Sequence, residues 1–342
     1  MHTGRGGMAR ELKDAPHAVR RQEASGKAVQ ELIARCRRHP PQFVVTCARG
    51  SSDNAATFAK HLIERYLRIP VAAAAPNIAT VYHQRLKLKN QLLLVISQSG
   101  RSDDLAEFSR MAKSAGATTA AVVNDITSPL AEICDVILPM AAGPELSVAA
   151  TKSFIATLAM LLRVTAVWSE DRALSAALDK LPDRLEQATA LDWGACVDAL
   201  SQANSLVTIG RGPTLAIARE AALKLKETCY LHAEAFSSAE FQHGPLSLVS
   251  PLYPIVMFMP SDAAVATMRE LAASLRAKGA ALFCTDNEAR IVDRLPVLDF
   301  DQPDADAVCL IQSFYAVVIR IAAMRGTNVD MPRHLQKITR TR

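Results

Sequence analysis

Three serines, a glutamine and a glycine lie close together in the segment Ser97-Gln98-Ser99-Gly100-Arg101-Ser102. Their hydroxyl, amide and backbone N–H groups suit a small oxyanion bound where a helix begins. Gly100 would let the backbone approach such a ligand closely. The segment lacks both the GK[ST] ending of a P-loop and the GxGxxG pattern of a dinucleotide site. The sequence therefore predicts a site for a single phosphate ester rather than for a nucleotide.

The residues on either side predict a loop between a strand and a helix. Leu92–Ile96 is a short apolar run, typical of a buried strand, and the residues after Ser102 show apolar side chains at helical spacing as far as Gly116. Ligands bind at such loops in open parallel sheets. The alternative is a purely local role, in which the serines cap the helix and form turns while Asp103 and Asp104 complement its dipole.

A second loop rich in glycine and hydroxyl groups follows an earlier apolar run and contains Gly50, Ser51 and Ser52. Its position after a predicted strand allows it to face the same pocket as the serine loop. The alternative is that it only caps the helix that follows it.

The chain contains an internal repeat. FVVTCARGSSDNAATFAKHLIE aligns with SLVTIGRGPTLAIAREAALKLK, so that Gly212 takes the place of Gly50, and the same ungapped register aligns Leu92–Ser97 with Pro254–Met259. Strands that alternate with helices predict parallel sheets covered on both faces, here in two copies. The serine loop occurs only in the first copy, since the second has Met259-Pro260-Ser261-Asp262. We expect only the first copy to hold the oxyanion.

The repeat predicts the domain organisation. Residues 1–28 form an N-terminal tail and helix, residues 29–185 the first domain with the phosphate loop, and residues 186–342 the second domain with a C-terminal tail. With 342 residues, 50% of them hydrophobic, the chain can fill two cores.

Charge and composition favour a soluble protein of the cytoplasm. The net charge of +5 is dispersed, and the densest basic cluster, Arg35–Arg38, reads as a solvated helix end, so no nucleic-acid partner is predicted. The seven cysteines show no CxxC and no metal-ligand spacing, which predicts reduced thiols, no metal and no cofactor. The most apolar segment, Phe154–Trp168, is short for a bilayer and contains Arg163, and no signal peptide precedes it.

These features together resemble the sugar isomerase (SIS) family, and within it the isomerase half of glucosamine-6-phosphate synthase and, more closely, the stand-alone amino-sugar phosphate deaminases. The resemblance spans nearly the whole chain, through RGSSDNA (49–55), SQSGRSDD (97–104), GPELSVAATKSF (143–154), EAALKLKE (220–227), HAEAFSSAEFQHGPLSL (232–248) and DMPRHLQKITRT (330–341). It implies an α/β fold of two tandem SIS units, each a flavodoxin-like five-stranded parallel sheet between helices.

The resemblance also implies which residues bind the substrate. The sugar phosphate and the sugar are contacted by Gly50, Ser51, Ser52, Ser97, Gln98, Ser99, Ser102, Val148 and Ala150. Ala150 stands where the family has a serine, and Gln242 stands where the synthase has a lysine. The VAATK version of the motif is typical of the deaminases. The segment that precedes the first predicted strand at Phe43 is too short for the synthase's glutaminase domain.

The resemblance implies catalytic roles for four further residues. Glu227 is the proton-transfer base and Lys224 lies one turn before it. His243 is linked to ring opening and comes from the neighbouring subunit of a homodimer, whereas Lys337 contacts the carbonyl end of the open sugar. Without the resemblance, Glu220, Lys224 and Glu227 would be interpreted as a surface ladder of ion pairs at i,i+4 and i,i+3 spacing.

The chemistry fits these residue types, because one carboxylate can carry a proton between the first and second carbons of an open sugar. We therefore expect the conversion of glucosamine 6-phosphate to fructose 6-phosphate and ammonia. The alternatives are a galactosamine 6-phosphate or fructosamine phosphate substrate, or a non-catalytic module that senses a sugar phosphate. No membrane partner is expected.

Overall fold

A computed structural model describes residues 7–287 and 294–337 and divides the chain into two compact units. Unit 1 takes its described residues from Met1–Pro16, Leu146–Thr151 and Lys180–Leu335. Unit 2 takes them from His17–Glu145, Lys152–Asp179 and Gln336–Arg342. Both units are therefore discontinuous in the chain. The contiguous boundaries given above stay a prediction, and residues 1–6 and 338–342 of the predicted tails lie outside the described residues.

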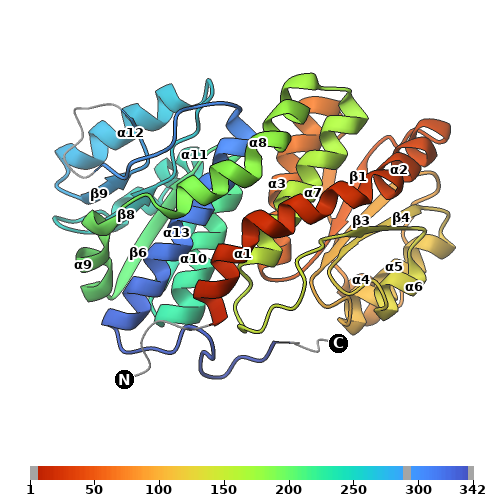
Figure 1. Ribbon diagram of the computed structural model, residues 1–342, viewed down its shortest axis with the longest axis horizontal. Coiled ribbons are helices and arrows are strands. Elements are labelled where there is room, and N and C mark those ends of the chain that lie inside the picture. Colours follow the sequence, from red (N-terminus) through yellow and green to blue (C-terminus); the bar gives the residue numbers. More distant parts are fainter. Residues whose placement is uncertain (1–6, 288–293, 338–342) are drawn as a thin grey trace. The chain divides into compact units, whose positions relative to one another are not determined.

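Unit 2 contains a parallel sheet of five strands (Figure 1). These are β1 (Val44–Cys47), β2 (Val71–Ala73), β3 (Leu92–Ser97), β4 (Thr118–Val123) and β5 (Val136–Pro139), in the order β2-β1-β3-β4-β5. The chain order reverses between β1 and β3, which makes this pair the switch point of a flavodoxin-like sheet. Every residue of β3 is buried, as the apolar run predicted.

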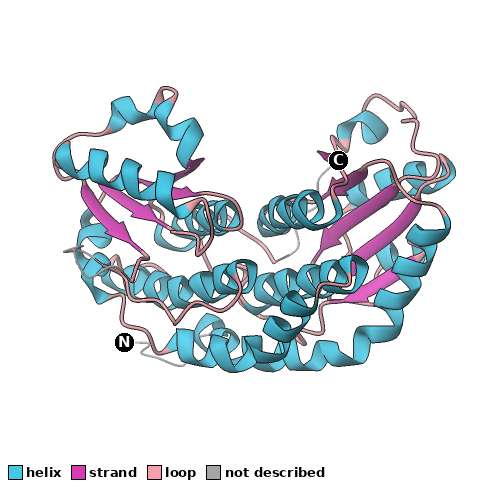
Figure 2. Ribbon diagram, turned by 90° about the horizontal axis from the view of Figure 1, so that it is seen from above, coloured by secondary structure: helices cyan, strands magenta, loops and turns pink. Residues whose placement is uncertain are grey.

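Helices cover both faces of this sheet (Figure 2). One set comprises α2 (Gly26–Arg38), α3 (Ser51–Leu62) and α7 (Lys152–Ser169), and the other α4 (Asn77–Thr80), α5 (Asp103–Ser114) and α6 (Pro129–Ile133). Short helical turns lie at Gln22–Ser25 and Ile63–Leu67, and unit 2 also holds the end of α1 (Gly7–Arg21) and the start of α8 (Arg172–Thr189). Side chains from β3, β4 and α5, such as Leu93, Ala121 and Phe108, form the core between the sheet and the second set.

Unit 1 repeats the arrangement. Its sheet has the order β7-β6-β8-β9, with β6 (Ser205–Gly210), β7 (His232–Ser237), β8 (Pro254–Met257) and β9 (Ala281–Cys284). The helices are α9 (Gly194–Gln202), α10 (Thr214–Cys229), α11 (Ser238–Gln242), α12 (Val265–Ala277) and α13 (Pro303–Met324), with a 3-10 turn at Pro245–Leu248. The ungapped register of the sequence repeat carries β1 to β4 onto β6 to β9, all parallel. The predicted α/β fold with two units is confirmed.

The second sheet differs from the expected five strands, because its described part has four. Residues 298–301, which match β5, form no strand, and only an isolated parallel bridge between Cys284 and Arg294 continues the sheet beyond β9. Carbonyls in and near this segment accept hydrogen bonds from side chains instead. The Trp193 indole N–H donates to the Pro296 carbonyl (2.7 Å) and the Arg184 guanidinium to that of Asp299 (2.9 Å).

Two helices, α7 and α13, are long and apolar enough to cross a membrane on length and composition alone. In each, more than 70% of the most apolar 18-residue window is buried inside the structure, as in the core helices of globular proteins. The seven cysteines are buried free thiols, and burial raises the pKa of the Cys47 thiol to about 12. Such a thiol is protonated and unreactive at neutral pH.

Candidate active site

The serine loop of unit 2 is held in shape by two of its own hydroxyl groups. The Ser97 hydroxyl accepts the N–H of Gly100 (3.1 Å), and the Ser99 hydroxyl accepts that of Arg101 (3.3 Å). Ser102 is the N-cap residue of α5, but its side chain makes no capping hydrogen bond. Gln98, Ser99 and Ser102 are half-buried. The local-turn alternative therefore accounts for Ser97 and Ser99 and leaves Ser102 unexplained.

Gly100 is required by the packing beneath the loop. Its φ is +63°, and a Cβ at this position would lie 2.0 Å from the Ser128 hydroxyl oxygen. Ser128 is buried at the start of α6, and the Leu130 N–H donates to the Gly100 carbonyl (3.2 Å). The start of α6 thus packs directly against the loop, and a side chain at position 100 would clash with Ser128.

The loop after β1 lies beside the serine loop. Arg49, which precedes Gly50, donates to the carboxylate of Asp104 at the start of α5 through Nε (3.0 Å) and Nη2 (2.9 Å). Asp104 is 2% exposed, so this ion pair is anchored in the protein. This ion pair joins the residue before Gly50 to the first turn of the helix after the serine loop, so the two loops adjoin at the switch point.

Lys337, at the end of the described tail, belongs to unit 2, where its ammonium group contacts Glu145 (2.8 Å). The Glu145 side chain is fully buried and also accepts the N–H (3.0 Å) and the hydroxyl (2.7 Å) of Ser153. Burial would raise the pKa of Glu145, but the Lys337 ammonium and the Ser153 donors together hold that pKa below its ordinary value. The sequence analysis missed Glu145, although it is the only acid within the GPELSVAATKSF segment.

In unit 1, α10 carries a buried row of charges. Lys224 and Glu220 are fully buried with their charged groups 3.3 Å apart, and the Lys224 ammonium also contacts the Glu227 carboxylate. Burial would lower the pKa of Lys224, but the two carboxylates outweigh it and raise that pKa. Tyr315 on α13 donates to Glu220 (3.1 Å). The residues do not form the surface ladder that their spacing alone would suggest.

Glu227 is the member of this row that reaches the surface. Its side chain is 22% exposed and lines an open pocket of about 390 Å³, together with Tyr230, His232, Arg333 and His334. The buried Lys224 contacts the Glu227 carboxylate on its protein side, and the pocket leaves that carboxylate accessible on the other side. A base that must meet a substrate needs this combination.

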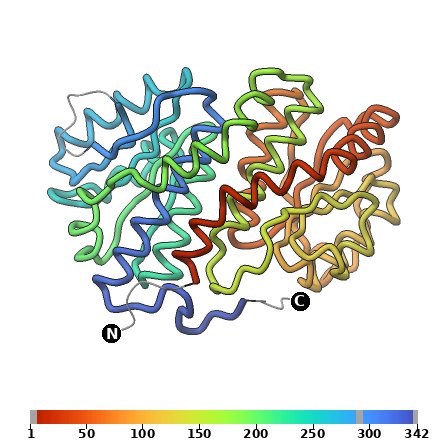
Figure 3. Tube along the Cα trace, viewed as in Figure 1, coloured from red at the N-terminus to blue at the C-terminus, as the bar shows by residue number. Residues whose placement is uncertain are grey.

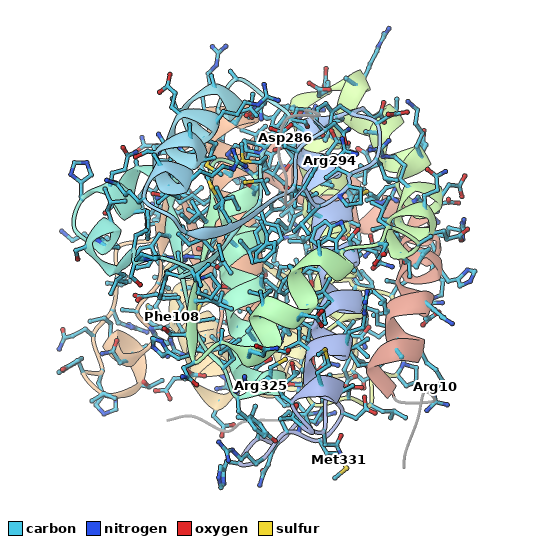
Figure 4. All side chains as sticks on the ribbon, turned by 90° about the vertical axis from the view of Figure 1, so that its left-hand side faces the viewer. Arg10, Phe108, Asp286, Arg294, Arg325 and Met331 are labelled. Carbon is cyan, nitrogen blue, oxygen red and sulfur yellow. The ribbon has the colours of Figure 1, made fainter. Side chains whose placement is uncertain are left out.

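The tail after α13 is anchored to the end of α10, and its trace is the last blue segment in Figure 3. Arg325 donates to the Cys229 carbonyl (2.8 Å) and Thr327 to the Thr228 carbonyl (2.6 Å), so two of the carbonyls left free at the last turn of α10 are satisfied. The Arg333 guanidinium stacks 4.2 Å from the centre of the Tyr230 ring. Figure 4 shows Arg325 at the end of α13 and Met331 on the tail below it.

The segment with Val148 and Ala150 belongs to unit 1, where both residues are half-buried. The Val148 N–H donates to the Asp330 carbonyl (3.1 Å). The Asp330 carboxylate accepts the N–H groups of Gly7 (2.9 Å) and Met8 (2.8 Å) at the start of α1. Asp330 thus joins the tail, this segment and the first helix.

His243 is exposed at the end of α11, and its backbone N–H donates to the Glu240 carbonyl (3.0 Å). Phe241, two residues before His243, lies in the core of unit 1, where α11 packs it against Phe236 (ring centres 5.7 Å apart). Leu248 is 48% exposed and remains available for a partner.

Metal ligands do not gather anywhere in residues 7–287 and 294–337: no three histidine, cysteine, aspartate or glutamate side chains are placed to hold an ion.

Known proteins match this chain in both of its units. The model of the SIS domain matches residues 42–166 and 199–324. A glutamine–fructose-6-phosphate aminotransferase (isomerizing) of Zymomonas mobilis subsp. mobilis is 32% identical over 320 residues, covering 86% of this chain and 51% of that protein. The chain spans about half the length of the curated relatives it matches.

Two solved structures are similar over nearly the whole chain. A candidate phosphosugar isomerase from Silicibacter pomeroyi DSS-3 is 42% identical, with a TM-score of 0.90, covering 95% of this chain and 100% of the other. The C-terminal domain of glucosamine-fructose-6-phosphate aminotransferase from Francisella tularensis is 26% identical, with a TM-score of 0.86, covering 96% and 99%.

Proposed function

This chain belongs to the SIS domain family, and on that basis we propose that it converts glucosamine 6-phosphate and water to fructose 6-phosphate and ammonia. The observation that carries the proposal is the Glu227 carboxylate, exposed to a pocket on one side and held by the buried Lys224 on the other. The names of the relatives, a fructose-6-phosphate aminotransferase and a candidate phosphosugar isomerase, support a phosphorylated sugar as substrate.

The proposed reaction moves one proton between neighbouring carbons. After the ring opens, Glu227 takes the proton from C2, which leaves an enolaminate with its negative charge on O1, and returns the proton to C1. A proton then passes from the nitrogen to O1, which leaves a neutral imine at C2. Water adds to the imine, and ammonia leaves as the C2 carbonyl forms. Two carboxylates stabilise the charge of Lys224 and raise its pKa, and its ammonium group holds the Glu227 carboxylate in position between the two transfers.

The phosphate end of the substrate is assigned to the loops of unit 2. The hydroxyls of Ser99 and Ser102, the N-terminus of α5 and the neighbouring Ser51 and Ser52 supply neutral donors for a dianion. Lys337 is proposed to act at the carbonyl end, in exchange for its contact with Glu145.

Ammonia release from a panel of amino-sugar phosphates, without glutamine or added metal, tests the proposal. Glucosamine 6-phosphate, galactosamine 6-phosphate and fructosamine 6-phosphate form the panel, and unphosphorylated glucosamine is the control. We expect release from the first compound. Binding of a sugar phosphate with no turnover of any member would favour the sensing module instead.

Substituting Ser99 by alanine is expected to raise KM for the phosphorylated substrate with little change in kcat. One hydrogen bond to a charged group contributes about 1.5–3 kcal/mol, and the loop also loses the acceptor for the Arg101 N–H. Steady-state kinetics measure the effect. The matched control is Ser114→Ala at the exposed end of α5. An unchanged KM in a folded Ser99→Ala variant would remove this serine from the phosphate site.

We further propose a homodimer in which His243 acts at the neighbouring chain's site, because this histidine is exposed and lies in a loop whose Leu248 is also exposed. Mixing inactive Glu227→Gln and His243→Ala chains should then restore activity. Random pairing makes about half of the dimers mixed, each with one intact site, so about a quarter of wild-type activity is expected. Native mass spectrometry counts the mixed dimers, and their complete inactivity would place His243 outside the partner's site.

A further inference from the structure

We propose that the second copy of the repeat keeps a site for a small oxyanion and that the protein's own Asp306 carboxylate occupies it. The register of the repeat, in which Gly212 matches Gly50, places Thr214 at the position of Ser52 and Ser261 at the position of Ser99. Both Thr214 and Ser261 line one cavity of unit 1, together with Arg184 and Asp306. The two positions assigned to phosphate binding in the first copy therefore border a cavity in the second.

The Asp306 carboxylate lies among donors typical of an oxyanion site. The Ser261 hydroxyl donates to Oδ2 (2.7 Å), the Arg184 guanidinium donates to Oδ1 (2.7 Å), and the Asp301 N–H lies 3.3 Å from both oxygens. Asp306 belongs to the first turn of α13, and the residue is 8% exposed. A hydroxyl, a guanidinium and a backbone N–H would hold an external anion in the same way.

The site around the Asp306 carboxylate contains a small cavity and a guanidinium N–H group that makes no hydrogen bond to the described residues. A cavity of about 20 Å³ remains beside the carboxylate, enough for one water molecule. The Nε of Arg184 is buried and has no hydrogen-bond partner in the part of the chain that the structure describes. Burial raises the pKa of the Asp306 carboxyl despite its donors, so these donors offset only part of the cost of burying the charge.

The difference between the copies then has a physical cause. In the first copy the donors of the serine loop are offered to a ligand, whereas in the second copy a side chain of the protein supplies the negative charge and keeps external anions out. The loss of Gln98, Gly100 and Ser102 equivalents at Pro260, Asp262 and Ala264 accompanies this closure. The inference concerns unit 1 alone and does not depend on the proposed reaction.

The test removes the internal anion and supplies one from solution. We expect Asp306→Ala in the full chain to unfold at a lower temperature than the wild type, and sodium formate to recover part of that loss in a concentration-dependent way. Sodium chloride at the same ionic strength controls for salt. A ligand that binds the folded state raises its stability by mass action, so the recovery also yields an affinity for formate.

Arg184 provides the specificity control. In the double variant Asp306→Ala, Arg184→Met the formate effect should disappear, whereas in the wild type formate should act no differently from chloride. Equal responses of Asp306→Ala to formate and chloride would overturn the proposal. If Asp306→Ala does not fold in chloride, its refolding yield is compared in the two salts. Refolding in formate alone supports the site, and failure in both salts overturns it.

Discussion

Replacement of Glu227 by glutamine is expected to lower kcat by on the order of 100-fold or more while the substrate still binds. The amide keeps the shape of the side chain but cannot accept a proton from C2. The buried Lys224 retains its contact with Glu220, so the helix should remain folded. Turnover of glucosamine 6-phosphate measures the loss, and equilibrium dialysis with the same sugar measures the binding that remains.

The matched control is Glu234→Gln, which changes an exposed glutamate on β7 of the same unit and should leave turnover unchanged. Exchange of solvent deuterium into the sugar provides the discriminating measurement. If the Glu227→Gln variant exchanges deuterium at a near-normal rate, then another residue carries the proton.

Replacement of Lys224 by methionine is expected to lower the free energy of unfolding by about 3–5 kcal/mol, the usual effect of removing one partner of a buried ion pair. Lys224 is fully buried, and its loss leaves the buried Glu220 carboxylate without its ammonium neighbour. Urea unfolding followed by circular dichroism measures the change. Activity should fall as well, since Glu227 loses the group that orients it.

Lys226→Met on the same helix is the control, since this lysine is exposed, and its effect should stay within about 0.5 kcal/mol. The double variant Glu220→Gln, Lys224→Met should recover part of the stability, because both buried charges are then absent. A loss of less than about 1 kcal/mol in the single variant would mean that the carboxylates are stabilised by other groups.

The fold could be predicted largely because it occurs twice. The runs that became β1 and β3 in the first copy reappear in the same register as β6 and β8, and each begins the same strand–loop–helix unit. That residues 298–301 form no strand in the described part of the second sheet could not be predicted, because their apolar positions alternate as in a strand. Carbonyls in and near this segment accept hydrogen bonds from Trp193 and Arg184, which come from distant segments.

Those parts of the candidate site that are formed by one short segment of the chain were predictable from the sequence. The serine loop and the Lys224–Glu227 spacing are both visible in short segments, and the structure places each on the expected loop or helix. The burial of Lys224 was not predictable from its spacing, because Tyr315 and the rest of α13 that cover it lie far along the chain. The sequence suggests for Asp104 at most a role at the dipole of α5, and only the fold brings Arg49 to it.

The ion pair between Glu145 and Lys337 joins residues 192 positions apart, both within unit 2. A chain still attached to the ribosome, with everything up to Asp179 outside, would already hold all five strands of the unit 2 sheet and the full serine loop. Its Glu145 would still lack the Lys337 ammonium group, which is synthesised only after residues 180–335 of unit 1. Unit 2 is thus translated mostly before unit 1, yet its Glu145–Lys337 ion pair forms only after the chain has been made as far as Lys337.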